Sequence, residues 1–328
     1  MTGASGARQR RKEVEGTLEQ RRLGRHGPLV SAVGLGCMGM SQFYGRRDDD
    51  ESVATVRRAL DLGVTFFDTA DMYGPYHNER LLRRALGRRR EGVVVATKFG
   101  NVKDRQGRLV GVDGRPEHVR EACGGSLRRL GADAVDLYYQ HRVDPAVPVE
   151  ETWGALAELV RAGDVRHLGI CTADPGTVRR AAAVHPVAAV QLECSVLDRA
   201  AEALLPTLRE LGTGFVAYAP LGQGLLGGRL RGTAELDADD VRRTLPRFEP
   251  GALRDRLALV DRLAELAGRR RATVAQLAIA WVLARGGDVA AIPGSRRRAH
   301  LEENLGAASL RLDAEDLAWI DAAAAPAQ

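Results

Sequence analysis

The chain has 328 residues, of which 45% are hydrophobic and 28% are charged. A chain of this length can bury one large core, and α/β barrels commonly exceed the usual domain size without dividing, so one domain is expected. The net charge of +5 comes from arginines spread along the chain, and aromatic residues make up only 5% of it. Nucleic-acid binding, which needs a basic face interleaved with aromatics or a recognisable module, is therefore not expected.

The sequence also predicts the cellular compartment of the protein. No apolar run approaches the length that crosses a bilayer, and residues 1–16 contain no hydrophobic stretch of the signal-peptide kind. The cysteines show no CxxC pairing, which argues against a disulfide framework and a structural zinc site. We expect a cytoplasmic protein without a metal site or membrane partner, with a solvated tail over 1–16 and one barrel domain over 17–328. The oligomeric state is not predicted.

A hairpin is expected first, because Gly27 and Pro28 can form a turn between two short strands, and we expect it to plug the bottom of a barrel. Short β-rich runs then alternate with helical patterns. These runs end near Cys37, Asp68, Lys98, His141, Cys171, Glu193, Tyr218 and Pro293. Eight βα units predict a closed parallel (β/α)₈ barrel, a TIM barrel, and further helices around Leu257 and Leu277 make it longer toward the C-terminus.

Helix boundaries have clear signals in two places. Asp48 to Asp50 can cap a helix that Gly63 ends, and Pro116 can open a helix that Gly131 ends. The pattern GxGxxG occurs twice, at Gly34 to Gly39 and at Gly222 to Gly227. A dinucleotide-binding Rossmann turn needs a helix at its last glycine, and residues 40–47 show none. We therefore interpret both as loops of the barrel rim, and the long segment 220–250 as a possible lid.

Polar residues just past the ends of barrel strands point into the active site of such folds. Asp68, Lys98 and His141 occupy those positions on three consecutive strands, and Tyr73 follows in the loop after Asp68. A nearby ammonium lowers the pKa of a phenol, so Lys98 is expected to help Tyr73 exchange a proton, with Asp68 balancing the charge and His141 orienting a carbonyl. Each residue alone is better explained as structural, but their common location favours catalysis.

The segments GVTFFDTADMYGPYHNERLLRRAL, ATKFG, DLYYQHRVDP, PLGQGLLGG and IPGSRRRAHLEEN resemble the aldo-keto reductase superfamily, in particular its longer bacterial and plant members related to pyridoxal reductase and auxin-induced proteins. The likeness covers about residues 17 to 325. It implies that Asp68, Tyr73, Lys98 and His141 form a catalytic tetrad with Tyr73 as general acid. It also implies NADPH-dependent reduction of a small aldehyde or ketone.

The resemblance further implies which residues bind the cofactor. Gln191 is expected to hold the nicotinamide carboxamide, Leu221 to Gln223 the pyrophosphate, Ser295 and Arg296 the 2′-phosphate, and Glu303 with Asn304 the adenine. The remaining expected cofactor contacts are Gly39, Met40, Cys171, Thr172, Cys194, Ala219, Gly224, Gly294 and His300. NADPH is preferred over NADH because guanidinium groups bind phosphate well.

Two positions depart from the family pattern. Cys194 stands where relatives carry a tyrosine expected to stack on the nicotinamide, and Cys171 with Thr172 replace a serine and a polar amide or acid. Another side chain filling the gap, a pocket widened for a bulky substrate, and weakened hydride transfer remain as explanations, in that order. A zinc or redox role for the two thiols is less expected than ordinary burial.

Two other functions stay open at this point. The first is an NADPH-binding sensor with weak turnover, and the second is a glycoside hydrolase or lyase that uses Asp68 and Glu193. The substrate is not predicted. Its candidate contacts are Met38, Met40, Phe43, Tyr44, Phe99 and the loop from Leu225 to Pro250.

Overall fold

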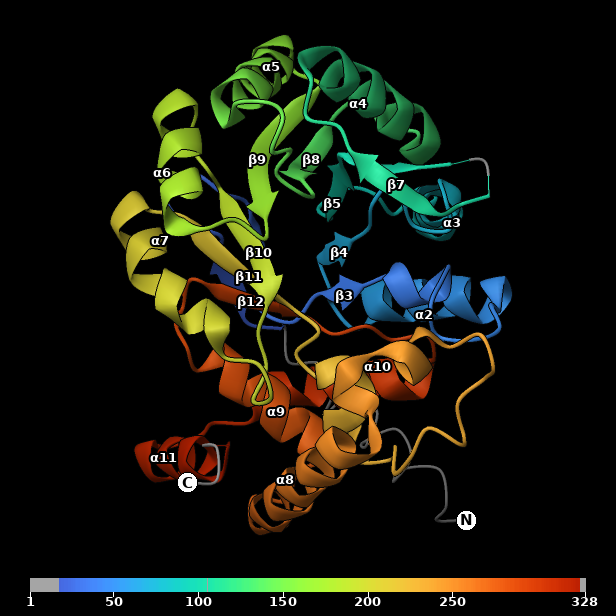
Figure 1. Ribbon diagram of the computed structural model, residues 1–328, viewed down its shortest axis with the longest axis vertical. Coiled ribbons are helices and arrows are strands. Elements are labelled where there is room, and N and C mark those ends of the chain that lie inside the picture. Colours follow the sequence, from blue (N-terminus) through green and yellow to red (C-terminus); the bar gives the residue numbers. More distant parts are fainter. Residues whose placement is uncertain (1–17, 105, 325–328) are drawn as a thin grey trace, which may run out of the picture.

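A parallel eight-stranded sheet forms the centre of the computed structural model, which describes residues 18–104 and 106–324 (Figure 1). The strands follow one another in chain order: β3 (Leu35–Gly36), β4 (Phe66–Asp68), β5 (Val94–Phe99), β8 (Val135–Gln140), β9 (Val165–Cys171), β10 (Ala189–Glu193), β11 (Gly214–Tyr218) and β12 (Val289–Ile292). Parallel bridges from Val33 to Ala291 and from Gly36 to Gly294 join the first strand region to the last. The predicted barrel is confirmed. The predicted tail lies outside the described residues.

Helices surround the strands as an outer layer (Figure 1). They are α2 (Asp49–Asp61), α3 (His77–Leu86), α4 (Pro116–Leu130), α5 (Val149–Ala162), α6 (Pro175–Val184), α7 (Leu205–Leu211), α8 (Pro250–Arg269), α9 (Val274–Leu283), α10 (Arg298–Leu305) and α11 (Ala314–Ala324). The predicted extra helices toward the C-terminus are present, since both α8 and α9 lie between β11 and β12. Within the described residues, no helix is both long and apolar enough to cross a membrane.

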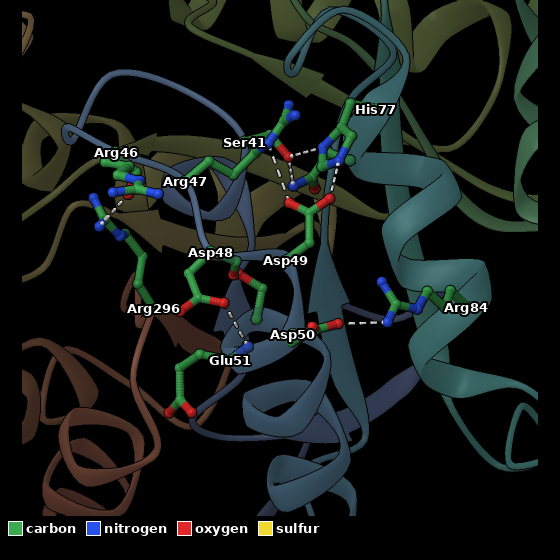
Figure 2. Close-up of polar contacts among 12 residues, drawn as sticks. Ser41, Arg46, Arg47, Asp48, Asp49, Asp50, Glu51, His77, Arg84 and Arg296 are labelled. Atoms are coloured by element: carbon green, nitrogen blue, oxygen red, sulfur yellow. Dashed lines mark hydrogen bonds and ion pairs between the residues drawn. The ribbon is translucent and has the colours of Figure 1, made fainter.

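The helix boundaries follow the signals in the sequence. The Asp48 side chain accepts a hydrogen bond from the Glu51 amide at 3.0 Å and so caps α2 (Figure 2). Pro116 is the first residue of α4, and Gly131 ends that helix with φ of +63°, a conformation that glycine adopts without strain.

The N-terminal hairpin consists of β1 (Gln20–Arg22) and β2 (Leu29–Ser31). Leu23 and Val30 are fully buried and belong to the same apolar cluster as the barrel interior. The amide of Arg25 donates to the Gly212 carbonyl at 2.6 Å, just before β11 begins. The hairpin therefore closes the end of the barrel where the strands start, as expected.

The rim at the other end contains an element that the pattern did not indicate. After β5 the chain forms an antiparallel hairpin, β6 (Asn101–Lys103) and β7 (Leu109–Val112). Leu109 and Val110 are 58% and 60% exposed, so this hairpin lacks the alternating burial by which a strand is recognised.

Both GxGxxG segments are rim loops, as interpreted. The first begins in β3 and passes into a 3₁₀ turn, Met38–Met40, without an α-helix before α2, and the second is a 3₁₀ segment, Gly222–Gly227, with positive φ at Gln223 and Gly224. The chain beyond the second loop crosses to the first, where the Val241 amide donates to the Phe43 carbonyl at 2.9 Å. This contact joins the segment that follows the second loop to the first rim loop.

A chain of polar contacts anchors the loop after β3. Ser41 Oγ lies 2.8 Å from His77 Nδ1, and His77 Nε2 lies 2.9 Å from Asp49 Oδ2 (Figure 2). Asn78 Nδ2 donates to Ser41 Oγ at 2.7 Å and to the Cys37 carbonyl at 2.9 Å. The first rim loop is thereby held against α2 and α3.

Candidate active site

Three strand ends bring the predicted acid and base groups together. Lys98, at the end of β5, donates from Nζ to Asp68 Oδ1 at 2.5 Å, to the Thr69 carbonyl at 2.9 Å and to Tyr73 Oη at 3.1 Å. Gln191 Nε2 donates to the other Asp68 oxygen at 2.7 Å. Lys98 is fully buried and Asp68 is 3% exposed, so the ion pair is held in a low-dielectric environment.

Tyr73 is a buried phenol whose hydroxyl faces this ion pair. Burial raises the pKa of Tyr73 to about 12, although the positive charge of Lys98 acts to lower it. The expected direction of the Lys98 contribution is therefore right, but desolvation outweighs it. Near neutral pH the phenol holds its proton, as an acid that donates to a carbonyl oxygen must.

His141 completes the group from the end of β8. Its amide donates to the Phe99 carbonyl at 2.9 Å, and its ring meets the Tyr73 ring edge-on with centroids 6.0 Å apart. Burial lowers the pKa of His141 well below its usual value, and the charges of Lys98 and Arg142 lower it further. The imidazole is therefore neutral, and its buried Nδ1 has no hydrogen-bond partner in the described chain. A neutral ring can donate to or accept from a substrate oxygen without carrying charge into the site.

A cleft of about 770 Å³ runs from this group to the end of β12. Asp68, Tyr73 and His141 line one end, while Lys98 lies behind them. The expected cofactor residues that line the cleft are Gly39, Cys171, Gln191, Ala219, Leu221, Gln223, Gly224, Gly294, Ser295, Arg296, His300, Glu303 and Asn304. Of the candidate substrate contacts, Met38, Phe43, Tyr44 and residues of the 225–250 loop line it as well, whereas Phe99 is buried against Tyr138.

The far end of the cleft contains cationic groups. Arg296 Nη2 donates to the Arg46 carbonyl at 2.9 Å and has no carboxylate partner among the described residues (Figure 2). Asn304 Nδ2 donates to Ser295 Oγ at 3.0 Å. Arg298, by contrast, pairs with Glu51 at 3.0 Å. Arg296 and Arg297 both line the cleft without a carboxylate partner in the described chain, so the charges of these two members of the basic segment remain available there.

Four expected cofactor residues, Met40, Gly222, Thr172 and Cys194, do not line the cleft. Met40 and Gly222 are buried within the rim loops, and Thr172 is exposed. Thr172 Oγ1 accepts a hydrogen bond from Arg142 at 2.8 Å.

Cys194 also lies away from the cleft, so the expectation that it faces the nicotinamide is not met. Along β10, Val190 and Leu192 pack in the outer apolar layer while Gln191 lines the cleft, so the alternation of side chains places Cys194 in the outer layer as well. It is 1% exposed in the outer apolar layer, whereas Cys171 lies inside the barrel. Burial raises the pKa of each thiol to about 12, which leaves both unreactive. A shared zinc or redox site is therefore not supported.

The aromatic side chain that lines this part of the cleft is Tyr218, at the end of β11. Tyr218 was not predicted as a site residue from the sequence, although its position at the end of a strand is the signal that identified Asp68 and His141. Arg142 lines the cleft too and was missed because it follows a residue already assigned.

The placement of Cys194 makes a testable prediction. Cys194→Tyr is expected to lower the free energy of unfolding by about 1–3 kcal/mol, because a ring must enter a packed layer. Urea unfolding measures this loss, and a fluorescence titration is expected to show unchanged NADPH affinity. A stable Cys194→Tyr protein with tighter NADPH binding would instead mean that residue 194 reaches the cleft.

Comparison with known proteins identifies the class. Residues 32–325 match the model of the Aldo/keto reductase family, and the chain belongs to this family. The glycerol dehydrogenase AKR11B4 from Gluconobacter oxydans is similar, with 30% identity over 93% of this chain and 94% of that one and a TM-score of 0.85. The aldo-keto reductase AKR11C1 from Bacillus halodurans, in its holo form, shares 28% identity over 94% and 97% of the two chains, with a TM-score of 0.78. A thermostable aldo-keto reductase, Tm1743, solved with the inhibitor epalrestat, shares 31% identity over 93% and 100%, with a TM-score of 0.74. The protein is accordingly an oxidoreductase of the carbonyl-reducing class.

Proposed function

We propose that the protein reduces an aldehyde or ketone to an alcohol with NADPH, and that Tyr73 is the general acid. The observation that carries this proposal is the buried Tyr73–Lys98–Asp68 chain beside a cleft of about 770 Å³ whose lining also reaches the residues after β11 and β12. A protonated phenol beside a fixed ammonium can give up its proton while the resulting charge is stabilised.

The residues of the cleft fit NADPH. Gln191 would hold the carboxamide, the Tyr218 ring would offer an apolar face to the nicotinamide, and the loop from Leu221 to Gly224 would bind the pyrophosphate. Gln223 Oε1 is buried without a partner in the described chain, so it is available to a ligand. When bound, the dihydronicotinamide supplies a hydride to the carbonyl carbon and is oxidised.

The protein's own groups then act on the oxygen. Tyr73 and His141 would bind the carbonyl oxygen and fix its orientation. As negative charge develops there, Tyr73 transfers its proton, and Lys98 stabilises the phenolate until solvent reprotonates it. Asp68, held by Lys98 and Gln191, keeps the ammonium in place.

The alternative of an NADPH-binding sensor rested on two altered nicotinamide contacts. One of them no longer supports it, because Cys194 does not reach the cleft. A paired-carboxylate hydrolase is not favoured either, since Asp68 is engaged by Lys98 and Glu193 by Arg247 at 2.5 Å. The four free, buried cysteines fit a reducing compartment, which we propose to be the cytoplasm.

The test combines binding and turnover. NADPH is titrated by fluorescence, and the complex is mixed with a panel of aromatic and aliphatic aldehydes while absorbance of the reduced cofactor is followed. Tight binding with oxidation by several aldehydes is expected. Folded protein that oxidises NADPH with no member of the panel would refute the proposal.

Cofactor preference depends on Arg296. We expect Arg296→Gln to raise the Kd for NADPH about 10- to 100-fold, because hydrogen bonds to a charged group contribute about 1.5–3 kcal/mol. The Kd for NADH, which lacks the 2′-phosphate, is expected to stay the same. Arg298→Gln is the matched control, since Arg298 already pairs with Glu51. Equal weakening of both cofactors in Arg296→Gln would show that this residue does not read the phosphate.

A further inference from the structure

Arg142 is a cation of the cleft wall without a carboxylate partner in the described chain. Its Nη1 donates to the His141 carbonyl at 2.9 Å and to Thr172 Oγ1 at 2.8 Å. Of the other cations of the cleft, Arg242 pairs with Asp240 at 2.7 Å and Arg229 with Glu303 at 2.8 Å, while Arg296 and Arg297 follow β12, where the cofactor phosphate is proposed to bind. A guanidinium left with two neutral acceptors retains its capacity for an anion.

The contact with Thr172 fixes the direction of this guanidinium. Thr172 has φ of +51°, a left-handed conformation that is a genuine outlier for a β-branched residue. Such strain persists only where the surrounding structure enforces it, and it commonly occurs at ligand sites. In this protein the strained residue is Thr172, whose hydroxyl accepts the hydrogen bond from Arg142 Nη1. Nε and Nη2 of Arg142 have no acceptor among the described residues. These two groups form the edge that can bind a carboxylate with two parallel hydrogen bonds.

The position of Arg142 separates it from the proposed cofactor phosphates. In the strand order β8 and β12 lie on opposite sides of the barrel mouth, so Arg142 and Arg296 are at opposite ends of the cleft. His141, next to Arg142 in the chain, is the proposed ligand of the carbonyl oxygen. Arg142 therefore lies on the substrate side.

Other side chains on the substrate side of the cleft are also hydrogen-bond donors that have a weak acceptor or none. Phe99 pairs with Gln140 in the sheet, so Asn101 and Arg142 follow at equivalent positions on the rim. Asn101 Nδ2 donates to the thioether sulfur of Met72, a weak acceptor. The buried Gln42 Nε2 has no partner in the described residues. All of these side chains line the cleft, so its substrate end is rich in unused donors.

We propose that the substrate is an oxo acid, in which Tyr73 and His141 bind the carbonyl and Arg142 binds a carboxylate. The inference rests on the proposed function and names its substrate class. The carbonyl carbon takes up the hydride and its oxygen the proton from Tyr73, which gives a hydroxy acid. The carboxylate is unchanged by the reaction. Arg142 is a specificity-determining residue, and Thr172 positions it.

The test compares an acid with its neutral ester. Steady-state kcat/KM at saturating NADPH is measured for 3- and 4-carboxybenzaldehyde and for their methyl esters, which have similarly activated carbonyls. The wild-type protein is expected to prefer at least one acid about 10-fold or more. Arg142→Gln is expected to lower kcat/KM for that acid about 10- to 100-fold and to change its ester little, because the lost bonds are made to a charged group. Arg142→Lys keeps the charge but lacks the two parallel N–H donors of a guanidinium, so its kcat/KM for the acid is expected to be intermediate.

Two controls separate this effect from others. Arg120→Gln removes the same charge from the exposed face of α4, where Arg120 pairs with Glu158. It is expected to leave kcat/KM unchanged for both the acid and the ester. NADPH affinity of Arg142→Gln is measured by fluorescence and is expected to match the wild type. Equal loss for acid and ester, or a weakened NADPH complex, would overturn the inference and assign Arg142 to the cofactor.

A readout without turnover distinguishes the two proposals. Binding of 3- and 4-hydroxymethylbenzoate, the corresponding products, to the NADP⁺ complex is measured by calorimetry in wild type and Arg142→Gln. If no aldehyde is reduced, the reductase proposal fails, but loss of product binding in Arg142→Gln alone still supports the anion site. Reduction of the esters with no preference for either acid leaves the reductase proposal standing and refutes the carboxylate.

Discussion

Tyr73→Phe is expected to lower the single-turnover rate of NADPH oxidation about 10²- to 10⁴-fold, the range that one positioned acid contributes. The ring is retained and only the hydroxyl that contacts Lys98 at 3.1 Å is removed. NADPH affinity is expected to stay near that of the wild type, because the proposed cofactor contacts lie along other strand ends. The loss therefore belongs to the proton-transfer step and not to cofactor binding.

A second tyrosine provides the matched control for this experiment. Tyr138 lies on β8, its hydroxyl is buried without a partner in the described chain, and it does not line the cleft. Tyr138→Phe is expected to turn over like the wild type. Rapid mixing of the preformed NADPH complex with an activated aldehyde gives both rates directly. Comparable oxidation by Tyr73→Phe would mean that another group, or water, supplies the proton.

The wild-type pH profile provides a further check on the acid. Burial raises the pKa of Tyr73 to about 12, so the phenol stays protonated across the neutral range. The kcat/KM for aldehyde reduction is therefore not expected to decline between about pH 7 and 9 through loss of this proton.

Strand ends were predictable because they combine two local signals, an apolar β-rich run and a polar residue directly after it. Asp68 and His141 each follow that rule, and parallel strands bring such positions to one rim. Tyr218 obeys the same rule, but the expected contacts after β11 came from the glycine-rich loop that follows it and not from the strand end.

What the sequence did not predict depends on orientation and dielectric. Cys194 is one residue past Glu193, and a shift of one residue reverses the side on which a strand residue points. Whether it faces the rim or the outer layer is set by the partner strands and not by the local pattern. The direction in which the pKa of Tyr73 shifts was unpredictable for a related reason. It depends on the balance between burial and the charge of Lys98, and burial is known only from the fold.

Lys98→Met is expected to lower the free energy of unfolding by about 3–5 kcal/mol near neutral pH and to abolish turnover. The reason is that Lys98 is fully buried and neutralises Asp68, whose carboxylate then remains in the barrel with only the Gln191 amide as partner. Burial already raises the pKa of Asp68 in the wild type, and Lys98 opposes that rise. Without Lys98 the pKa of Asp68 rises further.

The sign of the pH dependence follows from this shift. A carboxyl group whose pKa is higher in the folded than in the unfolded protein favours folding when it is protonated, and this contribution is lost as pH rises through the folded pKa. The stability deficit of Lys98→Met is therefore expected to be smaller at pH 5 than at pH 8 in urea unfolding. Lys98→Met combined with Asp68→Asn removes the buried charge and is expected to recover much of the stability and to flatten this pH dependence, while turnover stays absent. A deficit that is the same at both pH values, or a double variant no more stable than Lys98→Met, would show that Asp68 is not the source of the cost.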